Sequence, residues 1–377
     1  MGVVNTVHFA WRGAPWKGFR RGVSIHSHTS HSQETLDFIP RMAKPIPLLR
    51  SLIRRQEQRF RRLKGREFNY LDAWWTPPLG PREALRVERG QVDALGLRPL
   101  VSLSDHNNIE APLLLRMLPE GLETPISVEW TVPYHGTFFH VGVHNLPERS
   151  ATERMAAMAE YTASHRDTEL EPLLEWLSED PGTLVVLNHP HWDEKQIGQA
   201  FHDRRLHAFL RRLRMHVHGL EINGIRSWSE NRRTIDLASS EGLPVVGGGD
   251  RHGCEPNAII NLSNAESFPE FVAETRAGHC GVLLMPQYRE PRICRVMRSL
   301  SDVMRDNHEH THGWVRWTDR VFFRRPSGVV EPVSSVWGER ESPPMFIRAF
   351  ACVASLLDDR RVQTAVRHFA PVSEEVS

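Results

Sequence analysis

Histidine stands out as a source of chemistry in this 377-residue sequence, which contains 21 of them. Several histidines and acidic residues directly follow short apolar runs typical of buried strands. For example, His26 and His28 follow the run 23–25, and Asp250 follows the run 245–246 after three glycines. The residues that follow such a run or lie within one are His26, His28, His106, Glu129, His140, His189, Asp250 and His252. Because the carboxyl ends of barrel strands meet at one rim, we expect these side chains to lie together.

Two short segments have the spacing of paired ligands. Side chains two residues apart on an extended strand point the same way and lie about 7 Å apart. His26 and His28 can therefore address one centre, and the same holds for Asp250 and His252. The glycines at 247–249 remove side-chain bulk just before the second pair, which suits a crowded site.

A set of imidazoles with fewer carboxylates suits divalent transition metals, and we expect a multinuclear site that holds zinc, manganese or iron. Magnesium would prefer an oxygen-only shell and keep its waters. Two ions about 3.5–4 Å apart can share a hydroxide formed near neutral pH and hold both oxygens of an in-line displacement at phosphorus. This chemistry predicts phosphoester hydrolysis, with Arg226 and Arg251 as donors to the phosphate oxygens.

The motifs and their order resemble those of the PHP family of metal-dependent phosphoesterases, named for polymerase and histidinol phosphatase. The likeness spans about residues 23 to 285. Its blocks are HxHT at His26 to Thr29, SDHN at Ser104 to Asn107, Val128-Glu129, His140-Val141, Asn188-His189-Pro190, and Gly-Gly-Asp-Arg-His ending at His252. The resemblance implies an α/β fold, namely a distorted (β/α)7 TIM-like barrel of the PHP type.

The resemblance also implies two or three ions and how the ligands divide among them. The first ion would be held by His26, His28, Glu129 and Asp250. The second, bridged by Glu129, would be held by His140 and His189. A third would be held by His106, His252 and a ligand from the first loop.

The first-loop ligand departs from the family pattern. Many members have aspartate five residues after the second histidine, where this chain has Gln33, and others have histidine at six, where it has Glu34. We assign Glu34 as the ligand because its carboxylate can coordinate. Gln33 could coordinate weakly through its carbonyl, and His31 is a further alternative.

Alternating apolar runs and helical stretches predict parallel β/α units around this site. The expected strands are 23–25, 100–103, 126–128, 138–143, 184–187, 220–222 and 245–246. We assign residues 1–290 to the metal-binding barrel domain and 291–377 to a C-terminal extension of unknown role. The extension includes a patch formed by His308, His310 and His312.

An insertion at residues 36–80 interrupts the barrel domain directly after the first metal-binding loop. It contains a helix with an arginine-rich face, which is either a solvated surface or an arm that meets phosphates. Because of its position, we expect the insertion to form a lid over the barrel mouth.

The charge balance and composition of the chain limit the classes of partner that we expect. Lys plus Arg at 47 nearly cancels Asp plus Glu at 46, so no global field attracts nucleic acid or a membrane. The four scattered cysteines form no CxxC pair or disulfide framework. No apolar run approaches a membrane span, and the N-terminal segment lacks a signal-peptide hydrophobic region, so we expect a cytoplasmic protein without a membrane partner.

The leading hypothesis is a hydrolase whose substrate is a phosphorylated small molecule, a nucleotide or a short oligonucleotide, as monoester or diester. One alternative is a nucleic-acid processing or binding protein that uses the arginine-rich insertion and the basic stretch from Arg316 to Arg325. Another is a degenerate PHP scaffold. Hydrolysis of C–N bonds is also chemically open, because only the arginines and the resemblance favour P–O cleavage.

Overall fold

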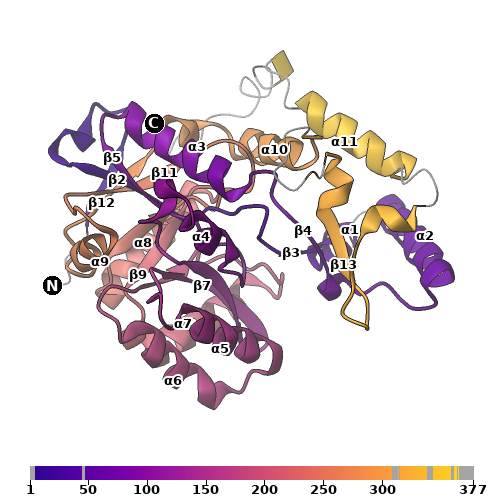
Figure 1. Cartoon of the computed structure of the whole chain (residues 1–377), viewed down its shortest axis with the longest axis horizontal. Helices are drawn as coiled ribbons and strands as arrows, with labels where there is room; N and C mark the ends of the chain where they lie inside the picture. Colours follow the sequence, from indigo (N-terminus) through magenta and orange to yellow (C-terminus); the bar gives the residue numbers. More distant parts are fainter. Residues whose placement is uncertain are drawn as a thin grey trace.

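The structure is a computed structural model that describes residues 5–44, 47–307, 313, 315–337, 343–357, 361–362 and 364. The patch of His308, His310 and His312 lies outside these residues. Within the described part of the chain, eleven α-helices accompany three β-sheets (Figure 1). The expected α/β class is therefore confirmed.

Two five-stranded sheets form the larger part of the molecule. In spatial order, the first comprises β1 (Val7–Phe9), β12 (Gly281–Leu284), β11 (Ile259–Ser263), β2 (Arg21–Ile25) and β5 (Arg98–Ser102). The second comprises β10 (Val245–Gly248), β9 (Gly219–Asn223), β8 (Leu184–Asn188), β7 (Thr137–His144) and β6 (Val128–Tyr134). β11 and β7 run antiparallel to both of their neighbours, and the other pairs are parallel.

The expected distorted (β/α)7 barrel is not shown, because no sheet closes on itself in the described residues. Isolated bridges between Ser27 and Arg251 and between His106 and Glu129 connect segments of the two sheets. The antiparallel pairing of β6 and β7 has a local cause. Only two residues connect these strands, and a parallel connection needs a crossover of about a dozen or more residues.

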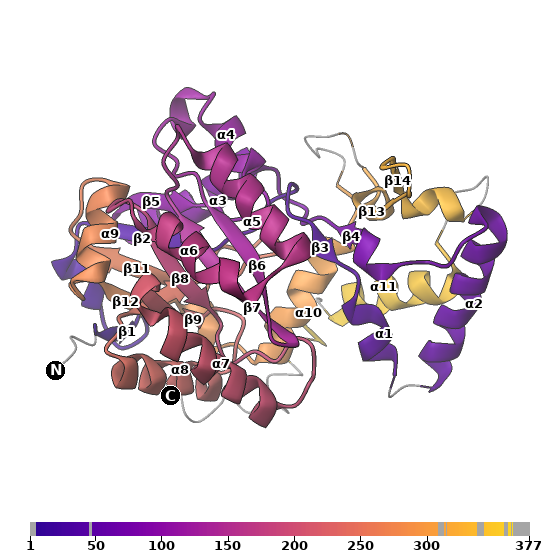
Figure 2. The same ribbon diagram turned by 90° about the horizontal axis from the view of Figure 1, so that it is seen from below.

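The helices lie mainly around the outer faces of the two sheets (Figure 2). Around these sheets are α3 (Pro81–Ala94), α4 (Glu110–Leu115), α5 (Ala151–Ser164), α6 (Asp167–Ser178), α7 (Gln199–Leu213), α8 (Trp228–Glu241) and α9 (Phe268–Arg276). Their ends follow from local chemistry. Ser227 caps α8 by accepting a hydrogen bond from the Glu230 N–H, and Gly242 ends it in the left-handed conformation.

Alternating side chains divide the core. Within β8, Val185 and Leu187 belong to the cluster that includes α5 to α8, whereas Leu184 and Val186 belong to a second cluster. That second cluster also contains Val23 of β2, so it joins the two sheets. The period of two in a strand thus supplies apolar groups both to the helices and to the space between the sheets.

The insertion and the C-terminal extension share a third sheet. It comprises β14 (Val330–Pro332), β13 (Val321–Arg324), β4 (Ala73–Trp75) and β3 (Glu34–Thr35). Its neighbouring helices are α1 (Phe38–Ala43), α2 (Pro47–Lys64), α10 (Arg292–Val303) and α11 (Met345–Leu357). Leu36, Phe60 and Phe323 pack in its core.

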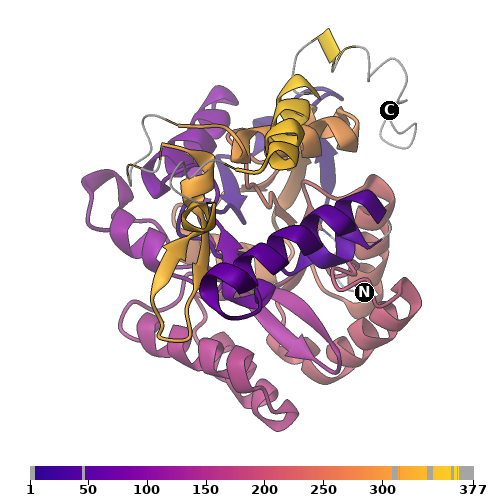
Figure 3. The same cartoon turned by 90° about the vertical axis from the view of Figure 1, so that its right-hand side faces the viewer.

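We call residues 34–75 and 321–357, where described, the side module. Figure 3 shows it in front of the two larger sheets. None of the described helices combines the length and apolar character needed to cross a membrane.

Candidate metal centre

The loops after β2 and β10 lie against each other and bring the two predicted ligand pairs together. The His28 N–H donates to the Arg251 carbonyl at 3.0 Å, and the Asp250 N–H donates to the His26 carbonyl at 2.7 Å. His26 and Asp250 have φ values of +62° and +55°, a region that non-glycine residues rarely occupy. Strained backbone of this kind is concentrated at functional sites, where surrounding contacts hold it in place.

One group of potential ligand atoms comprises His26, His28, Glu129 and Asp250, which are all buried. The Nε2 atoms of His26 and His28 lie 3.0 and 3.3 Å from Glu129 Oε2. They lie 3.6 and 3.4 Å from Asp250 Oδ1. Four donors from three separate parts of the chain therefore surround one small volume.

The donor set fits a divalent cation. His26 Nε2, His28 Nε2 and Glu129 Oε2 are buried and make no hydrogen bond with a described residue. Leaving such atoms unpaired costs free energy, and coordination of a cation removes that cost. Mixed imidazole and carboxylate donors suit transition metals better than magnesium.

A second group comprises His106, Glu129 and His140. His106 Nε2 lies 3.2 Å from Glu129 Oε2, and His140 Nδ1 lies 3.6 Å from Glu129 Oε1. His189 Nε2 lies beside it, 3.2 Å from Glu129 Oε1 and 3.4 Å from His140 Nδ1. Glu129 thus belongs to both groups, which is the geometry a bridging carboxylate needs.

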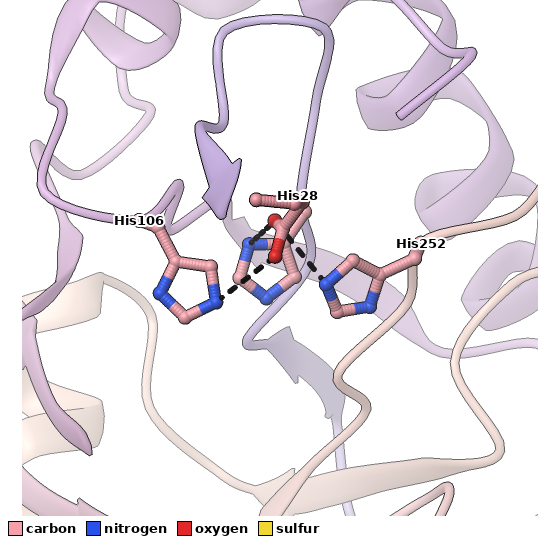
Figure 4. A group of neighbouring side chains, drawn as sticks. His28, His106 and His252 are labelled. Atoms are coloured by element: carbon pink, nitrogen blue, oxygen red, sulfur yellow. Dashed lines mark ion pairs between the residues drawn. The ribbon is translucent and has the colours of Figure 1, made fainter. Parts of the chain in front are cut away.

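A third group comprises His28, Glu34, His106 and His252. The Nε2 atoms of His106 and His252 lie 3.3 and 3.2 Å from the Glu34 carboxylate. Figure 4 shows the rings of His28, His106 and His252 converging. His252 therefore faces a different group from Asp250, although the sequence allowed both to address one centre.

The other first-loop residues lie differently. Gln33 is exposed, and His31 Nδ1 lies 3.0 Å from Glu110 Oε2 at the surface. Glu34 is held by Ser32, whose hydroxyl donates to Glu34 Oε1 at 2.6 Å. Of the three first-loop alternatives, the geometry favours Glu34.

Glu129 reaches the site because strand β6 alternates its side chains. Val128 and Trp130 belong to the core beside α5, and Trp130 Nε1 donates to the Met158 carbonyl at 3.0 Å. Glu129 points the other way, toward the ligand cluster, and it pairs with Gly142 of β7. The expected strand 126–128 is therefore displaced, because Glu129 is the second residue of β6 rather than the residue after it.

Two residues behind the ligands orient them. His26 Nδ1 lies 2.6 Å from Glu221 Oε2, so an Nδ1–H donating there leaves the Nε2 lone pair for a cation. The Asn223 amide donates to both Glu221 and Asp250, at 2.8 and 3.2 Å. A side chain on Gly248 would overlap the Glu221 carboxylate, which explains the glycine there. Glu221 and Asn223 lie two residues apart on β9, so the period of two in a strand is the sequence signal that places both on one face.

Electrostatics within the cluster favour positive charge. Burial opposes a charge on His28, but Asp250 and Glu129 outweigh it and raise the pKa of His28 to about 10. Burial likewise opposes ionisation of Glu129, yet the surrounding histidines hold the pKa of Glu129 well below its usual value. Burial lowers the pKa of His140 well below its usual value, so this imidazole stays neutral. The ionised carboxylates thus attract positive charge into this volume, either as the proton on His28 or as a cation that replaces it.

The role expected for Arg251 in binding phosphate is not supported by its contacts. Its guanidinium is buried and donates to Glu88 at 2.8 Å, to the Gly253 carbonyl at 2.8 Å and to the His28 carbonyl at 3.1 Å. Glu88 also accepts from Ser24 and Ser27. Arg251 therefore holds the two predicted ligand loops together, because Nε, Nη1 and Nη2 each donate to another part of the chain.

Arg226 is placed differently. It is 5% exposed, its Nε is unpartnered, and its guanidinium makes no hydrogen bond or ion pair with a described residue. The guanidinium carbon lies 3.7 Å from the centroid of the Trp192 ring, and the Trp192 ring lies 5.0 Å from the His189 ring. Arg226 is thus a buried, unpaired cation near the ligand cluster.

His191 is a further buried histidine close to the cluster. Its side chain is 6% exposed. Its Nδ1 lies 3.2 Å from Asp203 Oδ1, and its Nε2 has no hydrogen-bond partner among the described residues. The turn position, directly after Pro190, gave no signal for this burial because α7 supplies Asp203 from farther along the chain.

Comparisons with known proteins add little to this geometry. No protein-family model matches the sequence, and no curated protein matches it. Solved structures that resemble the chain include PsfC from Pseudomonas syringae, with 15% identity over 74% of this chain and 96% of that chain and a TM-score of 0.38. A provisionally described metal-dependent phosphoesterase from Bifidobacterium adolescentis has 15% identity over 68% of this chain and 96% of that chain, with a TM-score of 0.37.

An amidohydrolase from Chromobacterium violaceum, with bound sulfate and no metal, has 13% identity over 61% of this chain and 87% of that chain, with a TM-score of 0.34. Similarity at this level assigns no activity to this chain.

Proposed function

We propose that this protein is a metal-dependent phosphoesterase of the PHP type. The observation that carries the proposal is the convergence of eight side chains from distant segments into three overlapping groups, with His189 as a ninth side chain beside Glu129. The ligands would be His26, His28, Glu34, His106, Glu129, His140, His189, Asp250 and His252.

Divalent cations held by these groups would lower the pKa of water and polarise a phosphoryl oxygen. The chain's own residues prepare the site for such ions. Glu221 fixes the His26 ring, and Ser32 fixes Glu34. Burial of the cluster excludes bulk water, which strengthens every electrostatic interaction there.

Arg226 favours a phosphoester over other hydrolysable substrates. Its guanidinium can donate two parallel hydrogen bonds to phosphate oxygens, which an amide substrate does not offer. A buried cation without a described partner costs free energy that a bound phosphate would recover. We therefore assign Arg226 to bind the reacting phosphate.

Metal analysis combined with turnover tests the proposal. Purified protein should contain at least one tightly bound transition metal per chain and release phosphate from 4-nitrophenyl phosphate, its bis ester or a phosphometabolite. His189→Ala and Asp250→Ala should each lower kcat/KM by at least about a hundredfold. As a matched control, His207→Ala changes an exposed histidine of α7 and should leave activity unchanged.

A metal content well below one ion per chain would contradict the proposal. Activity that survives both ligand substitutions would contradict it as well, and would favour a degenerate scaffold with a contaminating hydrolase.

A further inference from the structure

A cavity of about 400 Å³ lies beside the ligand cluster. The loop between β8 and α7 contributes His191 and Trp192 to its lining, and Gln199 at the start of α7 adds to it. The lining also includes Arg226 and Arg292. Trp192 lines the cavity and also lies next to the cluster, because its ring lies 5.0 Å from the His189 ring and 6.4 Å from the His140 ring. A substrate whose phosphate reaches the cluster would extend into this cavity.

The cavity lining contains polar groups that are held in place but have no described partner. His191 and Arg226 are both more than nine-tenths buried, and His191 Nε2 and Arg226 Nε each lack a hydrogen bond with a described residue. Asp203 fixes the His191 ring, and Gln199 donates to both Asp203 and the His191 carbonyl at 2.9 Å. Such support is characteristic of a site built to meet a ligand.

The cavity lining has as many arginines as carboxylates, but no ion pair joins Arg292 to a carboxylate of the described residues. Two arginines, Arg226 and Arg292, face two carboxylates, those of Glu230 and Asp193. The Asp193 carboxylate already accepts hydrogen bonds from the Ile197 and Gly198 N–H groups, at 3.1 and 2.7 Å. Glu230 is therefore the carboxylate of the lining that backbone N–H groups do not already hold, whereas the lining has two guanidinium groups, those of Arg226 and Arg292. Arg292 begins α10 and is exposed, so it can move toward a ligand without unfolding the helix.

We propose that this cavity binds the leaving group of the phosphoester and selects leaving groups that carry a second anionic group, a carboxylate or a phosphate. Arg292 pairs with that second anion, while Arg226 contacts the reacting phosphate. His191 and Glu230 offer acceptors to hydroxyl groups of the same leaving group. The inference rests on the proposed phosphoesterase function and adds a substrate class to it.

Three phosphate monoesters with related leaving groups test this inference on the metal-loaded protein. They are phenyl phosphate, 4-carboxyphenyl phosphate and 4-(phosphonomethyl)phenyl phosphate, and release of inorganic phosphate is measured for each. At least one anionic ester should have a kcat/KM about tenfold above that of phenyl phosphate, which corresponds to one charge-assisted contact. The two anionic esters distinguish a carboxylate from a phosphate as the natural group.

Arg292→Gln should reduce the kcat/KM of the favoured anionic ester to that of phenyl phosphate, and the loss should appear in KM. Arg232→Gln, at an exposed arginine of α8 that does not line the cavity, is the matched control and should retain the preference. Calorimetry provides a readout without turnover. The product 4-hydroxybenzoate, or 4-(phosphonomethyl)phenol for a phosphate site, should bind the wild type more tightly than phenol does, and Arg292→Gln should abolish the difference.

The outcomes separate the two claims. Hydrolysis of all three esters at equal efficiency, or an equal loss on all three in Arg292→Gln, would overturn the cavity assignment and leave the phosphoesterase function standing. No phosphate release from any ester by metal-loaded wild type would overturn both.

Discussion

The hydrogen bond between His26 and Glu221 links a ligand to the residue that orients it. Glu221→Gln replaces the carboxylate that accepts from His26 Nδ1 at 2.6 Å. Loss of such a partner lowers metal affinity by about ten- to a hundredfold, because the ring is no longer held in the required orientation and tautomer. We expect that loss in a competition experiment with a chromophoric chelator.

Glu175→Gln, at an exposed glutamate of α6, serves as the control for the loss of one negative charge. Equal affinity in Glu221→Gln and the wild type would show that the hydrogen bond does not orient a ligand.

His144 makes stability depend on pH. Burial lowers the pKa of His144 to about 3, whereas a histidine in an unfolded chain titrates near 6.5. As the pH falls from about 6.5 toward 3, the unfolded state gains a proton that the folded state does not accept. The free energy of unfolding therefore decreases by about 1.4 kcal/mol per pH unit from this residue.

Urea unfolding at pH 7 and pH 5 in the presence of a chelator measures this contribution. Between these values the wild type should lose about 2 kcal/mol more than His144→Asn does. His207→Asn, at an exposed histidine, should behave like the wild type. The same pH dependence in His144→Asn and the wild type would contradict the expectation.

At the scale of elements, the third sheet couples the side module to the metal centre. β3 carries Glu34, and Trp75 of β4 lies opposite Glu34 with its ring 5.7 Å from the His252 ring. Phe60 of α2 packs in the same core, at 5.4 Å from the Phe323 ring. A substitution that disrupts this core should therefore disturb the group of proposed ligands around Glu34 and leave the His26 group in place.

Phe60→Ala tests this coupling. Removing a buried phenylalanine costs about 3–5 kcal/mol, so the side module should loosen. The metal content should fall only by the ion held at Glu34, while the His26 group, which sits on the two larger sheets, keeps its ion. Leu63→Ala, at a side chain that is 57% exposed, is the control and should retain the full content. Loss of all metal in Phe60→Ala would contradict the separation.

At the scale of the whole molecule, the near-zero net charge bears on the alternative hypothesis that the protein binds nucleic acid. The net charge is +1, and α2 lies far from the two larger sheets (Figure 1). Arg61 pairs with Glu67 at 3.5 Å, and Arg59 donates to the Trp337 carbonyl. We expect weak oligonucleotide binding that is lost at physiological salt, because only a few arginines can contact phosphates.

Neutralising Arg54, Arg55, Arg61 and Arg62 should remove the remaining binding at low salt and leave hydrolysis of 4-nitrophenyl phosphate unchanged. Submicromolar binding at about 0.15 M salt would instead support a nucleic-acid role for this face.

The sequence by itself determined which residues are brought together. Short apolar runs end at His26, His106 and His189, and strand periodicity is a local property that one segment of chain reveals. Most of the expected strands were located correctly for the same reason. The sequence also departs from the PHP family pattern at residue 34. The side chain at that position, Glu34, faces His106 and His252 in the structure.

Only the tertiary structure decided how these parts are used. Glu88 on α3 accepts a hydrogen bond from Arg251 Nε, and Asp203 on α7 helps to fix a buried His191. The sheets stay open, and β4 pairs with β13 although about 250 residues separate them. Such contacts depend on the register and packing of distant segments, which no local pattern encodes, so the shared side module and the cavity beside Trp192 emerge only from the folded chain.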